Sequence, residues 1–138
     1  MGTLLNPYLN FRGNAREAME FYRGVFGGKL TIATFADFHA SSDPGEDHLV
    51  MHADLEGPEG IRLMASDVRE RMEFRPGTNV SMSLSGEDEA ELRRYFERLS
   101  EGGSVSMPLE RAPWGDVFGM CTDRFGVNWL VNIAAPRG

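Results

Sequence analysis

The side chains that could bind or transform a small molecule lie at alternating positions of short apolar segments. From residue 48 to 55, apolar and polar residues alternate, which is typical of a half-buried strand. Such a strand places His48, His52 and Asp54 on one face, because residues two or four positions apart point the same way. Imidazole and carboxylate groups bind divalent metals and transfer protons, although a strand histidine is more often an ordinary pocket or surface residue.

A second candidate group lies near Trp114. Trp114 and Asp116 follow Pro113, where the chain enters a strand. An indole ring offers a flat apolar face, and a nearby carboxylate can anchor a cationic or hydroxyl-bearing ligand. The alternative is that Trp114 packs against a partner subunit.

Other chemically versatile residues have simpler interpretations. Cys121 has no neighbouring base that would activate it as a nucleophile, so we expect a small core residue. Trp129 alternates with Val131 and Ile133, which places it in the core. Asp67 and Asp123 each follow a strand and precede a turn, a position typical of turn caps.

Composition narrows the class of protein. The chain has 138 residues, of which 41% are hydrophobic and 25% charged, as in a globular domain. Its net charge of −7 argues against a nucleic-acid partner and suits neutral or cationic small molecules better. No apolar run approaches the roughly 18 residues of a membrane helix, and the N-terminal residues lack signal-peptide features. We therefore expect a cytoplasmic protein with no membrane partner.

Helices and strands alternate in a regular order. The first half predicts strands at 6–11, 29–37, 48–55 and 61–66, a helix at 15–26 and a polar loop at 38–47. Asn14 is the expected N-cap of this helix, and Gly27-Gly28 ends it. The second half predicts a helix at 89–100 and strands at 78–85, 104–110, 117–122 and 127–133.

The two halves repeat each other. Phe21 and Tyr95 lie 74 positions apart, as do Gly28 and Gly102. The order of elements predicts two βαβββ modules, residues 1–70 and 71–138, within one domain spanning 1–138. We expect an α+β fold in which both modules form a curved, mostly antiparallel eight-stranded sheet, with the helices on its convex face. The polar and aromatic strand faces would then line a concave cleft suited to a small molecule.

Several ordered blocks resemble a known family. They are Asn6-Pro7-Tyr8-Leu9-Asn10-Phe11, Gly13-Asn14, Glu17-Ala18, Phe21-Tyr22, Phe26-Gly27-Gly28, residues 61–67, Trp114-Gly115 and residues 123–132. The chain resembles PhnB-like proteins of the vicinal-oxygen-chelate superfamily, alongside glyoxalase I, bleomycin-resistance proteins and extradiol dioxygenases. This resemblance implies paired βαβββ modules and commonly a homodimer. Some members are labelled methyltransferases, but this sequence has no glycine-rich nucleotide loop to hold a methyl donor.

The resemblance also implies where a catalytic metal would bind. Family ligands are His, Gln or Glu on the first and last strands of each module, and the metal polarises two adjacent substrate oxygens. The matching neighbourhoods here hold no imidazole or carboxylate; they contain Asn6, Tyr8, Arg62, Met64, Asn79 and Leu130. We therefore expect no cofactor. The alternatives are a displaced divalent-metal site using His48, His52 and Asp54 in a lyase or dioxygenase, and an isomerase that uses His52 alone.

The resulting expectation is a homodimeric protein that binds a small organic molecule in its cleft. The candidate ligand-binding residues all point away from the expected helix-covered core. They are Tyr8, Asn10, His52, Asn79, Trp114, Asp116 and Asn132.

Overall fold

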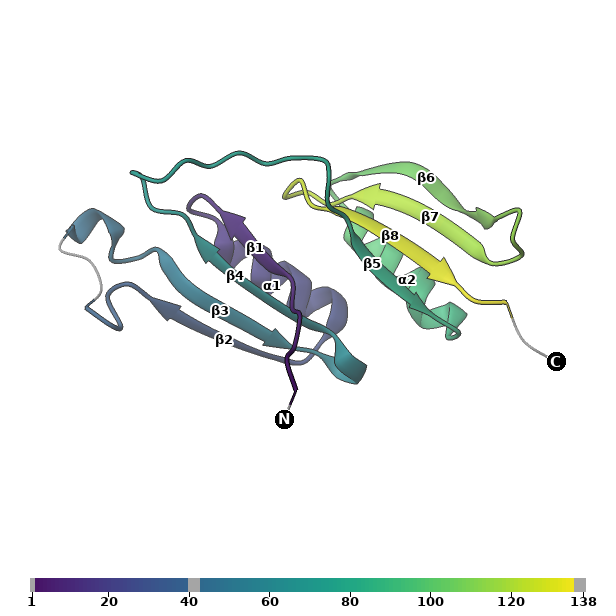
Figure 1. The fold of residues 1–138 in the computed structure, drawn as a ribbon, viewed down its shortest axis with the longest axis horizontal. Coiled ribbons are helices and arrows are strands. Elements are labelled where there is room, and N and C mark those ends of the chain that lie inside the picture. Colours follow the sequence, from purple (N-terminus) through teal and green to yellow (C-terminus); the bar gives the residue numbers. More distant parts are fainter. Residues whose placement is uncertain (1, 40–42, 136–138) are drawn as a thin grey trace. The chain divides into compact units, whose positions relative to one another are not determined.

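The computed structural model describes residues 2–39 and 43–135, and the chain divides into two compact units, residues 1–75 and 76–138. Each unit contains one four-stranded sheet with one helix packed on it (Figure 1). This is the predicted α+β fold of two βαβββ modules. Hydrogen bonds join the eight strands as two sheets of four.

In the first unit, β1 (Tyr8–Phe11) is followed by α1 (Ala15–Phe26), β2 (Lys29–Thr34), β3 (Val50–Glu56) and β4 (Arg62–Asp67). The strand order is β1-β4-β3-β2; β1 pairs with β4 in parallel and the other pairs are antiparallel. Two short 3-10 turns, Pro44–Glu46 and Pro58–Gly60, lie in the connections between strands.

The second unit repeats this topology. Its elements are β5 (Met82–Gly86), α2 (Glu89–Ser100), β6 (Ser104–Arg111), β7 (Val117–Thr122) and β8 (Asn128–Ile133). The order is β5-β8-β7-β6, and β5 is the parallel partner of β8. Both helices have the predicted bounds. An apolar stripe along each helix marks the face that packs on its sheet.

Each core lies between a helix and one face of its own sheet. In the first unit the fully covered residues include Met19 and Tyr22 of α1 and Leu55 of β3. In the second, Leu99 of α2 covers a sheet face that includes Trp129 and Val131. The buried positions of Trp129 and Cys121 confirm the predicted core roles. Within the described part of the chain, no helix is long and apolar enough to cross a membrane.

The start of α1 differs from the prediction. Among the described residues, the Asn14 side chain makes no capping hydrogen bond. Instead, Asp67 Oδ1 accepts a hydrogen bond from Ala15 N at 2.9 Å, and Asp67 Oδ2 accepts one from Val50 N at 2.9 Å. A carboxylate at the end of β4 therefore caps the helix and holds the start of β3.

Two strand predictions are wrong in detail. The fifth strand begins at Met82 and not at residue 78, so Asn79 lies in an exposed irregular segment and Val80 is 72% exposed. In β3 the pairing slips, since Ala33 is opposite His52 while Thr34 is opposite Val50. The extra residue is a β-bulge, which turns Val50 into the core. His48 lies in an exposed turn before the strand, so it does not share a strand face with His52.

Candidate functional site

The face of each sheet turned away from its helix, which we call the open face, holds most of the predicted site residues. In the first unit, strand pairing places Tyr8 opposite Met64 and Met64 opposite Asp54. Partners share a face, and residues two apart on a strand do too. The polar side chains on this open face therefore include Tyr8, Asn10, His52, Asp54 and Arg62.

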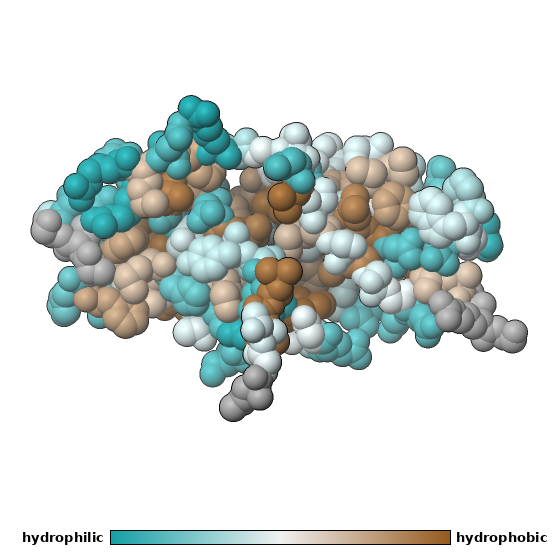
Figure 2. Space-filling view, viewed as in Figure 1, coloured by the Kyte–Doolittle hydropathy of each residue, from teal (hydrophilic) through white to brown (hydrophobic). Residues whose placement is uncertain are grey.

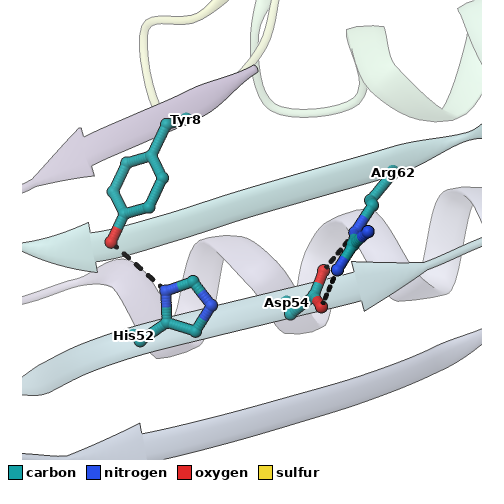
Figure 3. A network of polar contacts seen from close by, with 4 residues as sticks. All are labelled: Tyr8, His52, Asp54 and Arg62. Carbon is teal, nitrogen blue, oxygen red and sulfur yellow. Dashed lines mark hydrogen bonds and ion pairs between the residues drawn. The ribbon is translucent and has the colours of Figure 1, made fainter. Parts of the chain in front are cut away.

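Tyr8 and His52 meet across this face. The phenol oxygen of Tyr8 lies 3.4 Å from Nδ1 of His52, and the ring centroids are 5.8 Å apart (Figure 3). Tyr8 comes from β1 and His52 from β3, so the sheet itself brings the two rings together. A phenol and an imidazole in contact can bind a polar ligand atom or pass a proton.

Asp54 and Arg62 form a bidentate ion pair beside them. Arg62 donates from Nε to Asp54 Oδ1 at 3.1 Å and from Nη2 to Oδ2 at 2.8 Å. Figure 3 shows the guanidinium and carboxylate facing each other across adjacent strands. The hydrogen bonds from Arg62 lower the pKa of Asp54, so this carboxylate stays ionised and is held in place.

These residues do not fit the divalent metal that the family resemblance implies. On the open face, β1 and β4 offer Tyr8, Arg62 and Met64, and β8 offers Leu130 and Asn132. Within residues 2–39 and 43–135, no three His, Cys, Asp or Glu side chains are close enough to share a metal ion. The displaced site fits no better, because His48 lies outside β3 and Arg62 already engages both oxygens of Asp54.

In the second unit, Trp114, Asn132 and Asp116 form a hydrogen-bonded chain. Trp114 donates from Nε1 to Asn132 Oδ1 at 3.3 Å, and Asn132 donates from Nδ2 to Asp116 Oδ2 at 3.0 Å. Ala135 N donates to the other carboxylate oxygen of Asp116 at 2.9 Å. These hydrogen bonds fix the orientation of the Asn132 amide, and they connect the β6–β7 hairpin to β8.

Trp114 presents an aromatic surface on this face. Its ring packs edge-on against Phe118 with centroids 5.6 Å apart, yet the side chain is 61% exposed. Strand pairing adds Met120 and Leu130 to the same open face. The indole is therefore held at one edge by a hydrogen bond and a ring contact, while most of its surface remains available.

The structure thus sorts the seven predicted site residues into two groups and one outlier. Tyr8 and His52 are in contact, with Asn10 exposed on the same face; Trp114, Asp116 and Asn132 are joined by hydrogen bonds. Asn79 belongs to neither group. Phe118 was not among the residues predicted from the sequence, although its place two residues before Met120 in an alternating strand was the available signal.

The remaining titratable candidates are structural. Asp123 is buried and accepts hydrogen bonds from Phe125 N, Val127 N and Trp129 Nε1, which confirms the predicted turn cap. Burial raises the pKa of the Cys121 thiol, which keeps it protonated and unreactive. Figure 2 shows hydrophobic and hydrophilic residues interspersed over the visible surface of both units.

Comparison with known proteins places this geometry in a family. Residues 4–131 match the model of the Glyoxalase/Bleomycin resistance protein/Dioxygenase superfamily. The chain is 28% identical to protein YjdN of Escherichia coli (strain K12), covering 96% of this chain and 97% of that protein.

Two solved structures are also similar to this chain over nearly its whole length. Protein PA1353 of Pseudomonas aeruginosa is 41% identical, with a TM-score of 0.81 over 96% of this chain and 98% of that chain. A PhnB protein of Bacillus cereus is 29% identical, with a TM-score of 0.73 over 96% of this chain and 100% of that chain.

Proposed function

The chain belongs to the Glyoxalase/Bleomycin resistance protein/Dioxygenase superfamily, and from this membership we propose that it binds a small organic molecule on its open sheet faces without the metal common in that superfamily. The observation that carries the proposal is the Trp114 group. An exposed indole held in one orientation by Asn132 and Phe118 has already lost the side-chain entropy that ligand binding would otherwise cost. It offers a stacking surface beside a fixed amide and a carboxylate.

Truncation of Trp114 tests this proposal. A fragment library is screened against the wild type, and the dissociation constant of a hit is measured for Trp114→Ala. We expect affinity to fall by about 1–3 kcal/mol, the range for removing an ordered aromatic anchor. Phe38→Ala is the matched control, since Phe38 is equally exposed at 59% but lies on the β2–β3 connection. Unchanged binding by Trp114→Ala would overturn the proposal.

The alternative function, a metal-dependent lyase or dioxygenase, requires imidazole and carboxylate ligands that converge. His48 lies in an exposed turn outside β3, and Arg62 already engages both oxygens of Asp54, so these side chains do not form a shared ligand set. We expect a chelator to leave the thermal midpoint unchanged, because no metal-binding energy would contribute to folding. A fall of several degrees in the wild type that is absent in His52→Ala would establish the alternative.

We also propose that the chain forms a homodimer. β6 is an edge strand of its sheet, with Val105 46% and Met107 45% exposed. Exposed apolar side chains on an open edge favour association with a second copy. Sedimentation equilibrium would show a dimer in micromolar solution, and a monomer at that concentration would contradict the proposal.

A further inference from the structure

A cavity of about 640 Å³ opens on the helix side of the second unit. It lies between the start of α2, the β6–β7 hairpin and the end of β8. Leu109, Val117 and Ile133 contribute apolar surface to its lining. Val117 pairs with Ile133, whose side chain is buried on the helix side of β8, whereas Trp114 contacts Phe118 and Asn132 on the open face. The cavity is therefore separate from the site already described.

The repeat explains why the second unit has this cavity. The first and fifth residues of α1, Ala15 and Met19, are fully buried, whereas the matching residues of α2, Glu89 and Arg93, are exposed and line the cavity. In the first unit the connection between β2 and β3 spans residues 35–49, and its end is tied beside Ala15 through Asp67. In the second unit the corresponding connection is only residues 112–116, so the start of α2 stays open.

The charged groups around the cavity are not equally engaged. Arg93 Nε donates to Glu89 Oε2 at 2.8 Å, which leaves its Nη donors for other acceptors. Arg111 and Glu110 both line the cavity, but Arg111 pairs with Val117 on the cavity side, while Glu110 pairs with Phe118, which belongs to the open face. Among the described residues Arg111 has no carboxylate partner; its Nη1 donates to Gly115 O at 3.4 Å.

We propose that this cavity is a second binding site, for an organic anion with an apolar body. The apolar part would contact Leu109, Val117 and Ile133, and the carboxylate would accept hydrogen bonds from Arg111 and Arg93. Guanidinium groups match a carboxylate with two parallel hydrogen bonds, and the cavity volume lies within the roughly 300–1,000 Å³ of small-molecule sites. The lining holds two arginines and two glutamates, so its formal charge is zero, whereas the whole chain has a net charge of −7.

Three eight-carbon probes that differ only in the head group test the proposal. Binding of octanoate, octan-1-ol and octylammonium to the full chain is measured by amide chemical-shift titration. We expect octanoate to bind at least tenfold more tightly than the other two and to shift the amides of Glu89, Gly115 and Ala134. Arg111→Gln should weaken octanoate about tenfold and leave octan-1-ol unchanged.

Two control variants separate binding in this cavity from binding elsewhere on the chain. Arg94→Gln removes the same charge as Arg111→Gln, but from a position on α2 outside the cavity lining, and it should leave octanoate binding unchanged. Trp114→Ala should also leave it unchanged, whatever that variant does to ligands of the open face. Equal affinity for all three probes, or equal weakening by Arg94→Gln and Arg111→Gln, would overturn the proposal.

Discussion

The two units build the same fold but secure the start of their helices differently. Val68 N donates to Phe11 O at 2.7 Å, and Ala134 N donates to Gly86 O at the same distance, so Asp67 and Ile133, one residue earlier, are equivalent positions. Asp67 caps α1 from a distant strand and also holds β3. The side chain of Ile133 has no hydrogen-bond acceptor, so it cannot cap α2. The helix is instead capped locally by Asp88, whose Oδ1 accepts a hydrogen bond from Glu91 N at 3.1 Å.

This difference shows how one fold can carry different surfaces. In the first unit a buried carboxylate accepts hydrogen bonds from the start of α1 and the start of β3, and so ties the end of the long β2–β3 connection to the helix. The second unit has a local cap and a short hairpin, so the same place stays hollow. The open faces differ as well, since the first carries the Tyr8–His52 contact and an ion pair and the second carries Trp114 and Phe118.

The largest expected effect on stability comes from removing the Asp67 carboxylate, which has no equivalent in the second unit. Asp67→Ala leaves the buried amides of Ala15 and Val50 without their acceptor, and each unsatisfied group costs about 1–3 kcal/mol. We expect the free energy of unfolding to fall by about 3 kcal/mol, measured by urea denaturation. A loss below about 1 kcal/mol would show that the carboxylate is not the tie that distinguishes the units.

A smaller effect separates the two caps. Asp88→Ala removes a side-chain cap of α2 and should cost about 1 kcal/mol of unfolding free energy. Asn14 occupies the same position before α1, but it makes no capping bond among the described residues, so Asn14→Ala should cost close to nothing. Equal losses in the two variants, by the same urea measurement, would contradict the assignment of the caps.

The smallest expected effect is on how stability depends on pH in the acid range. Arg62 lowers the pKa of Asp54 in the folded state, so the pair stabilises the fold above the ordinary carboxyl pKa and loses that contribution as pH falls through the lowered value. Carbon-detected titration of Arg62→Gln should show the pKa of Asp54 rising. Asp37 is the internal control, because its pKa is lowered first by a hydrogen bond that it accepts from the Thr34 backbone N–H. A rise at both residues would mean a general effect of charge.

The sequence predicts the helices better than the strands because each helix carries its own evidence. The stripe of Met19, Tyr22 and Phe26 and the glycines after it lie within one segment. The bulge in β3 could not be predicted, since residues 48–55 alternate without a break and only pairing with β2 creates the extra residue. Asn79 was misplaced because the alternating pattern already starts before Met82, with Val80, whereas pairing with β8 begins only at Met82.

The site was predictable where alternation alone decides which way a side chain points. Tyr8, His52 and Asn132 needed no long-range information beyond that. Trp114 lies in the turn before β7, and its place next to that strand was the signal. The cap formed by Asp67 was missed because its partners lie far away in the sequence. The cavity beside α2 was missed because it depends on how much chain covers the helix, which a comparison of the two connections shows only once the strands are placed.

The central claim is metal-independent ligand binding through Trp114, and calorimetric titration of a screened hit into chelator-treated protein tests it most directly. The account predicts the same dissociation constant before and after chelator treatment, and weaker binding by Trp114→Ala under both conditions. Binding that disappears with the chelator and returns on adding a divalent metal, with Trp114→Ala behaving like the wild type, would contradict it.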